Sequence, residues 1–133
     1  MKNSSLIAVD FGTKKSGLAY SVESFCFGHK TVPTKELLPA LQSLIKEKNP
    51  EKIIFGMPYN IDGTMSAHGK RVLEYINTLQ GRVKIPIEVY DERLTSSEAE
   101  IGFDEAGIDG DVDREAARLI LERYLEEEGR FLA

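Results

Sequence analysis

The chain has very little cysteine and no long apolar run. Its single cysteine, Cys26, cannot form an internal disulfide, and its place between two phenylalanines is typical of a small buried hydrophobic residue. No segment approaches the roughly 20 consecutive apolar residues that span a bilayer, and the first residues lack the charged and then apolar pattern of a secretory signal. We therefore expect a cytoplasmic protein.

Positive charge and histidine are also scarce. Lys and Arg number 17 against 22 Asp and Glu, which gives a formal net charge of -5. A basic surplus is the usual sign of nucleic-acid binding, so this charge counts against such binding. Carboxylates that hold metal ions would themselves make the total negative, however, while a local basic rim still met phosphate. His29 and His68 have no paired spacing with Cys26, which excludes a zinc cluster.

Length and composition fit a single domain over residues 1–133, since 41% hydrophobic residues can fill one core. Apolar runs bounded by turn residues predict strands, and apolar residues at three- and four-residue spacing predict helices. The expected strands are residues 6–10, 17–21, 24–32, 52–57 and 83–90, and the expected helices are one that starts close to Pro39 and others over 66–79, 95–106 and 113–128. A three-strand meander followed by alternating strands and helices predicts an α/β fold, with a mixed sheet flanked by helices.

Acidic residues stand where the apolar segments end. Asp10 and the pair Asp91 and Glu92 follow predicted strands, and functional groups collect at the carboxyl ends of parallel strands. Asp113 continues the apolar stripe of the last helix backwards, so it is either an N-cap or dipole partner, or a metal ligand that faces into the fold. Asp91 and Glu92 leave a strand on opposite faces, and periodicity does not choose between them.

Carboxylates gathered at one place favour a bound cation, because like charges raise each other's pKa. Mg²⁺ and Mn²⁺ prefer carboxylate oxygen, water and substrate phosphate, and two such ions about 4 Å apart can activate water and stabilise a leaving oxygen. The acids therefore favour metal-dependent hydrolysis of phosphodiester bonds. A serine nucleophile in TSSEA, residues 95–99, is disfavoured because the segment lacks a base and fits a helix cap.

Four segments, in order along nearly the whole chain, carry a family resemblance. They are DFGTKKSGLAYS from Asp10, IIFGMPYNIDGT from Ile53, YDERLTSSEA from Tyr90 and DVDREAARLILERYL from Asp111. Together they resemble the YqgF family of Holliday-junction-resolvase-like proteins, which have a ribonuclease H fold. The resemblance implies that fold, with a five-stranded mixed sheet. It also implies a metal-dependent nuclease that processes the 5' end of pre-16S ribosomal RNA.

The same motifs imply the residues of the site. The catalytic and metal-binding set implied by the resemblance is Asp10, Glu92 and Asp113, holding one or two Mg²⁺ or Mn²⁺ ions. The implied phosphate contacts, each with an alternative interpretation as a surface charge or turn residue, are Lys14, Lys15, Asn60, Arg71 and Arg93. Lys15 and Ser16 depart from the family pattern, which usually has Arg and Ile there, so a bidentate guanidinium becomes a point charge.

Other function classes compete with an RNA nuclease. Actin-like proteins and sugar kinases also read Asp-x-Gly-Thr after a strand, but they close two such domains over a nucleotide and 133 residues supply one. A Holliday junction resolvase acting on branched DNA stays open, as does a non-catalytic RNA-binding adaptor of the same fold. A resolvase that cuts two strands symmetrically would need two active sites, which favours a homodimer.

Overall fold

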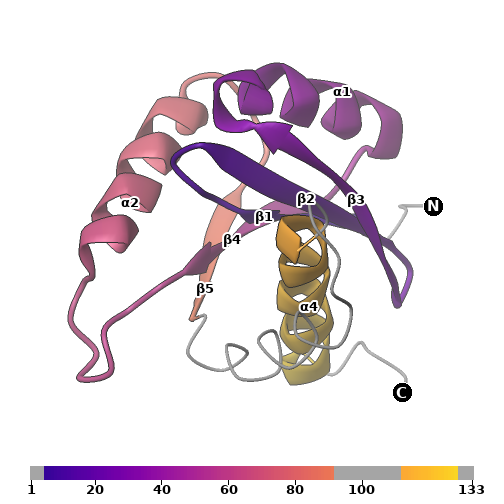
Figure 1. The fold of residues 1–133 in the computed structure, drawn as a ribbon. Coiled ribbons are helices and arrows are strands. Elements are labelled where there is room, and N and C mark those ends of the chain that lie inside the picture. The colour runs from indigo at the N-terminus through magenta and orange to yellow at the C-terminus, as the bar shows by residue number, and fades with distance from the viewer. Residues whose placement is uncertain (1–4, 92–111, 129–133) are drawn as a thin grey trace.

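A five-stranded mixed sheet forms the centre of the computed structural model, which describes residues 5–91 and 112–128 (Figure 1). The strand order is β3-β2-β1-β4-β5. β1 pairs antiparallel with β2 and β2 with β3, whereas β4 runs parallel to β1 and to β5. The strands are β1 Ser5–Asp10, β2 Lys15–Val22, β3 Phe25–Pro33, β4 Lys52–Met57 and β5 Ile87–Asp91. The expected meander followed by parallel strands is confirmed.

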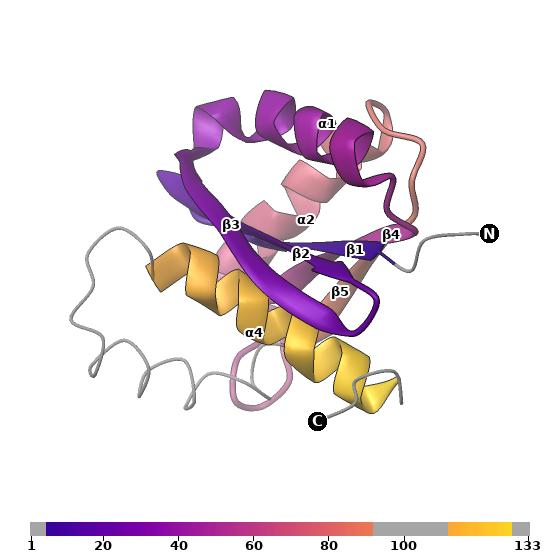
Figure 2. The same ribbon diagram turned by 90° about the vertical axis from the view of Figure 1, so that its right-hand side faces the viewer.

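Helices cover both faces of this sheet. α1, Leu37–Lys48, leads from β3 to β4, and α2, Ala67–Gln80, joins the parallel strands β4 and β5. Both lie on one face, while α4, Val112–Glu127, lies across the other (Figures 1 and 2). A short 3-10 helix, Thr34–Glu36, precedes α1, and the α-helix itself begins at Leu37. Pro39 therefore falls in the first turn, where its missing N–H breaks no helical hydrogen bond.

Two local signals set the start and the end of these helices. Ser66 caps α2, since its hydroxyl oxygen accepts a hydrogen bond from the Gly69 amide at 2.9 Å. α1 ends at Asn49, which adopts the left-handed conformation with φ 50° while its amide donates to the Ile45 carbonyl at 2.8 Å. Local chemistry thus fixes where α2 starts and where α1 stops.

The sheet separates two cores of different character. On the face toward α1 and α2, large side chains fill the interior; Ile7, Val9, Leu18 and Phe55 all have an exposed fraction of 0%. On the face toward α4, β1 and β2 contribute Leu6 with the small residues Ala8 and Ala19. Small side chains on the sheet let α4 pack close to it.

The structure differs from the sequence prediction at β5, which begins at Ile87 instead of residue 83. Pro86 has no N–H to donate to a strand ladder, and only its carbonyl takes part, accepting from the Ile53 amide at 2.9 Å. The helix expected over residues 95–106 lies outside the described residues. Among the helices that the structure describes, none is long and apolar enough to cross a membrane.

Candidate active site

Hydrogen bonds fix the turn between β1 and β2. The Gly12 amide donates to the Ser16 hydroxyl at 3.1 Å, and the Thr34 hydroxyl donates to the Gly12 carbonyl at 2.6 Å. The two hydroxyl oxygens lie 2.8 Å apart, and the Thr34 amide donates to the Lys14 carbonyl at 2.9 Å. Ser16 is fully buried. The turn that carries Lys14 is therefore tied to the segment that leads into α1.

Asp10, the last residue of β1, belongs to the face of the sheet that α4 covers. Side chains alternate along a strand, and Leu6 and Ala8, which share the parity of Asp10, pack in the α4 core. In the antiparallel pairing of β1 with β2, the register partner of Asp10 is Gly17. The first expected acid therefore stands at the carboxyl end of β1, level with Gly17.

The first turn of α4 brings Asp113 to the same corner of the sheet, meaning the carboxyl end of β1 where Asp10 pairs with Gly17. A Cβ built on Gly17 would lie 2.0 Å from the carbonyl oxygen of Asp113, so only glycine permits the helix to approach this closely. Because Gly17 is also the register partner of Asp10, two of the three expected acids converge here. α4 begins at Val112, so Asp113 lies inside the first turn and is not the N-cap.

The Asp113 carboxylate is not fully satisfied by the protein. Its Oδ2 atom is buried and accepts no hydrogen bond within the part of the chain that the structure describes. The Lys15 ammonium lies 4.0 Å away, at the limit of an ion pair, and its side chain is about half exposed. Burial raises the pKa of the Asp113 carboxyl, and the Lys15 charge opposes this only in part. A buried carboxylate oxygen without a donor is costly, and a bound cation would remove that cost.

The faces of β5 bear on the choice between Asp91 and Glu92. Tyr90 packs in the α4 core, whereas Ile87 packs against the core on the α1 and α2 side. Asp91 has the parity of Ile87, so it belongs to the face of the sheet opposite Asp10. Glu92 and Arg93 lie outside the described residues.

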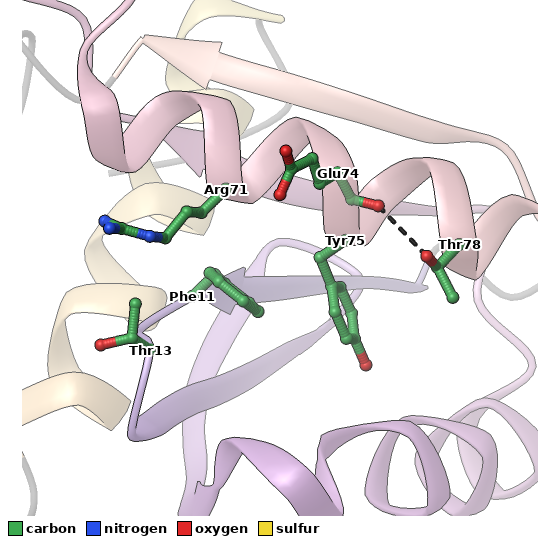
Figure 3. Close-up of a pocket in the computed structure, with 6 residues that line it drawn as sticks. All are labelled: Phe11, Thr13, Arg71, Glu74, Tyr75 and Thr78. Atoms are coloured by element: carbon green, nitrogen blue, oxygen red, sulfur yellow. Dashed lines mark hydrogen bonds between the residues drawn. The ribbon is translucent and has the colours of Figure 1, made fainter.

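The described residues expected to contact phosphate fall into two groups. Lys14 and Lys15 are exposed on the β1–β2 turn, and Arg71 of α2 lines a pocket that also takes in Phe11 of that turn (Figure 3). Asn60 is instead used within its own loop after β4, where its side-chain amide donates to the Thr64 hydroxyl at 2.9 Å. Of these cations, Lys15 lies near the Asp113 carboxylate, whereas Arg71 lies on the α2 side of the sheet, opposite the face of Asp10. The Asn60 amide has a partner within its own loop.

The carboxylates near Gly17 are ligands suited to a hard divalent cation. Carboxylate oxygens, as on Asp10 and Asp113, are the ligands that Mg²⁺ and Mn²⁺ prefer. The buried Oδ2 of Asp113, which has no hydrogen-bond donor in the described part of the chain, is the feature of this structure that fits such an ion. Within residues 5–91 and 112–128, no group of three His, Cys, Asp or Glu side chains is placed to hold a metal. The third expected ligand, Glu92, belongs to the segment that is not described.

Sequence reasoning missed the residues that assemble this corner. Gly17 was predicted only as the start of a strand, although a glycine inside a strand is a signal for close backbone approach. Ser16 was noted as a departure from the family pattern, and Thr34 was not singled out. Their shared hydrogen bonds join positions far apart in the chain, which no local pattern reveals.

Comparison with known proteins identifies the family. A family model described as RuvX, Holliday junction resolvase, matches residues 4–127. The chain belongs to the RuvX family. A Saccharophagus degradans protein named "Putative pre-16S rRNA nuclease" is 39% identical over 134 residues, covering 93% of this RuvX chain and 94% of the relative. An Escherichia coli O7:K1 protein of the same name is 35% identical over 139 residues, covering 92% and 96%. The family resemblance predicted from four motifs is confirmed, and with it the nuclease class.

Solved structures identify the fold of this RuvX chain. The structure of Thermus thermophilus RuvC matches it with a TM-score of 0.59 at 11% identity, covering 95% of this chain and 97% of that one. The same protein in complex with a Holliday junction substrate matches with a TM-score of 0.57 at 14% identity, covering 96% and 98%. At these identities the likeness establishes the fold alone, and the expected ribonuclease H-like fold is confirmed.

Proposed function

We propose that this RuvX chain is a metal-dependent nuclease that hydrolyses phosphodiester bonds in processing the 5' end of pre-16S ribosomal RNA. The observation that carries the proposal is the approach of Asp113 to Gly17, the register partner of Asp10. One Asp113 oxygen is buried there with no donor among the residues that the structure describes. The substrate follows from the names of the Saccharophagus degradans and Escherichia coli relatives. A ribosomal precursor as substrate places the protein in the cytoplasm.

The proposed metal ligands are Asp10, Glu92 and Asp113. Glu92 is preferred to Asp91 because Asp91 belongs to the opposite face of the sheet. One or two bound Mg²⁺ or Mn²⁺ ions would supply an activated water and stabilise the departing oxygen. The chain's own carboxylates fix where that chemistry happens, since Asp10 is held by the sheet and Asp113 by the helix packed on it.

Basic side chains on the two sides of β1 would hold the nucleic-acid backbone. Lys14 and Lys15 reach from the β1–β2 turn, and Arg71 reaches from α2 (Figure 3). Arg93 completes the proposed set. These groups neutralise phosphate charge locally even though the whole chain has a net charge of -5. Asn60 stays in the proposed set as the member whose amide also donates within its own loop, to the Thr64 hydroxyl.

The test is cleavage of two substrates by wild type and by conservative variants. The substrates are precursor RNA containing the 5' leader of 16S rRNA and a four-way DNA junction, each with and without Mn²⁺. Asp10→Asn and Asp113→Asn should each lower the cleavage rate of the RNA at least about 100-fold, because each removes a charged ligand. Glu126→Gln is the matched control, since this acid of the same helix pairs with Arg123 at 3.0 Å.

Three outcomes would contradict the proposal in different ways. Cleavage without a divalent metal would refute the mechanism, as would an Asp10→Asn variant as active as wild type. Preferential cleavage of the junction would favour the resolvase, and sedimentation should then show the homodimer that a symmetric double cut requires. Metal-independent binding of the RNA without cleavage would favour the adaptor.

A further inference from the structure

A pocket lies between the β1–β2 turn and α2, on the face of the sheet opposite the α4 core to which Asp10 belongs. Its volume is about 310 Å³ and its walls are Phe11, Thr13, Arg71, Glu74, Tyr75 and Thr78. Phe11 and Thr13 come from the β1–β2 turn, and the other four project from successive turns of α2 (Figure 3). Phe11 directly follows Asp10, so the pocket begins one residue from the proposed metal ligand.

An aromatic wall with fixed geometry lines this pocket. The ring centroids of Phe11 and Tyr75 lie 4.9 Å apart, and the two rings are tilted by 36°. The His68 ring also stacks on Phe11, with centroids 6.0 Å apart, and its Nε2 atom lies 2.7 Å from the Phe11 carbonyl oxygen. Phe11 and Tyr75 are only half-buried. The pocket therefore offers supported, partly exposed ring surface, on which a planar ligand can stack.

Two charged side chains, those of Arg71 and Glu74, also line this pocket. Arg71 and Glu74 project from one face of α2, one turn apart (Figure 3). Within the described residues, neither side chain has a hydrogen bond or an ion pair, even though their spacing along the helix would allow one. A purely apolar ligand would leave both groups unused. A ligand with a flat ring, hydrogen-bond donors and a phosphate would use the aromatic wall, the carboxylate and the guanidinium together.

We propose that this pocket receives one unstacked nucleobase of the substrate strand, next to the phosphodiester bond that is cut. This inference rests on the proposed nuclease function. Asp10 belongs by its parity to the α4 face of the sheet, whereas Phe11, the next residue, packs against the core on the α1 and α2 side. The two residues would therefore contact a phosphate and the neighbouring base on the two sides of β1. Arg71 binds the phosphate of the same nucleotide, and the Phe11 and Tyr75 rings stack on its base.

The chemistry of Glu74 selects among the bases. An ionised carboxylate only accepts hydrogen bonds, and its two oxygens suit a pair of donors side by side. Guanine presents such a pair, an imino N–H and an amino group, on its Watson–Crick edge. We therefore expect guanine to be preferred at this position of the strand.

A single tryptophan can report on the pocket, because the chain has none of its own. Tyr75→Trp is placed in the Asp10→Asn chain, which is not expected to cleave, and is titrated with short single-stranded oligoribonucleotides in Mg²⁺. A base stacked on the indole should quench its fluorescence, most strongly for a guanine-containing strand. The matched control is Phe25→Trp in the same chain, at a site that is 67% exposed at the far end of the β2–β3 hairpin, where no quenching is expected.

Affinity measured without the reporter provides the second readout. Tyr75→Leu keeps an apolar wall but removes the stacking surface, so binding of the oligoribonucleotide to the Asp10→Asn chain should weaken about tenfold. Glu74→Gln should bring the affinity for guanine-containing strands down to that for the other bases. Thermal unfolding of each variant checks that it is folded.

The outcomes separate this inference from the proposed function. An unquenched reporter together with unchanged affinity for Tyr75→Leu would overturn the nucleobase pocket, even if wild type cleaves RNA. Equal quenching by all four bases would overturn the assignment to guanine. Quenching by free guanosine monophosphate as strong as by the strand would show a mononucleotide site and would also overturn the proposal. If wild type does not cleave RNA but the reporter is quenched, the proposed nuclease function is contradicted and the assignment of the pocket to a nucleobase stands.

Discussion

The two ends of α4 are attached to the sheet in different ways. At the N-terminal end the backbone of Asp113 lies directly on Gly17, and one oxygen of its carboxylate has no donor among residues 5–91 and 112–128. Toward the C-terminal end, Tyr124 donates to Glu88 at 2.7 Å and accepts from Lys52 at 2.9 Å. Lys52 also donates to Glu88 at 2.9 Å, so each of these three side chains is hydrogen-bonded to the other two.

The two halves of α4 therefore have different roles: the C-terminal half stabilises the fold, and the first turn carries the candidate catalytic carboxylate. The C-terminal half is held by polar groups that satisfy one another, including Tyr90, whose hydroxyl donates to Glu127 at 2.7 Å. Because that half is anchored, the first turn can hold a carboxylate that the protein itself leaves under-satisfied. The same fold therefore keeps α4 in place and leaves one buried carboxylate oxygen without a hydrogen bond from the described residues.

The largest expected effect comes from filling the space at the N-terminal end. Gly17→Ala would place a Cβ against the Asp113 backbone, so the helix must move, and unfolding free energy should fall by about 3 kcal/mol. Gly28→Ala is the matched control, because its Cβ would meet the Arg114 side chain, with Cγ at 2.7 Å, and should cost less than Gly17→Ala since a side chain can shift more than a helix backbone. Urea denaturation measures both, and equal losses would show that the backbone contact at Gly17 is unimportant.

A metal ion bound at the N-terminal end of α4 should stabilise the folded chain. At a Mn²⁺ concentration ten times the dissociation constant, the unfolding free energy should rise by about 1.4 kcal/mol, which raises Tm by about 5 °C for a chain of this length. Asp113→Asn should abolish the rise, because the carboxylate that meets the ion is gone. Tyr124→Phe should preserve it. Differential scanning calorimetry with and without Mn²⁺ gives the comparison, and a rise that survives Asp113→Asn would place the ion elsewhere.

A smaller effect is expected at the C-terminal end. Tyr124→Phe removes one hydroxyl that both accepts and donates, while Lys52 and Glu88 keep their own ion pair. The unfolding free energy should fall by about 1 kcal/mol, since these partners are partly exposed. Cleavage of RNA should be unchanged. A loss of cleavage in a folded Tyr124→Phe protein would show that the two ends of α4 are coupled.

The smallest expected effect is a decrease of thermal stability at alkaline pH. Burial raises the pKa of the Tyr90 phenol above its ordinary value of about 10, and the Glu127 carboxylate raises it further. A raised folded-state pKa means that the phenol contributes stability below about pH 10 and loses it as the pH rises further. Tm should therefore decline above pH 10 more steeply in wild type than in Tyr90→Phe. Parallel declines would show that Tyr90 titrates alike in the folded and unfolded chains.

Local chemistry explains which elements could be predicted from sequence. β4 was predicted with its observed bounds, Lys52–Met57, because a continuous apolar run is followed by Pro58. α2 was predicted to within one residue at each end, because Ser66 is a strong cap. β5 was predicted too long, because pairing with β4 sets where a strand starts and Val83 to Ile85 carry only strand-like composition.

The site was predictable as a list of acids but not as an arrangement. Asp10 could be placed at a strand end and Asp113 at a helix start, since each follows from periodicity. Their convergence depends on Gly17, whose close contact joins β2 to a helix almost a hundred residues later. Likewise, the parity of Asp91 was visible in the sequence, but which face of the sheet α4 covers was not.

The hydroxyl pair of Ser16 and Thr34 has an evolutionary consequence. The Ser16 hydroxyl accepts from the Gly12 amide and meets the Thr34 hydroxyl at 2.8 Å. An Ile at position 16 could not accept that bond, and the partly buried Thr34 hydroxyl would keep only its bond to the Gly12 carbonyl. The two positions should therefore covary, and a chain that exchanges only one of them during divergence would pass through a destabilised intermediate. A double-mutant cycle on this pair would measure how strongly one substitution constrains the other.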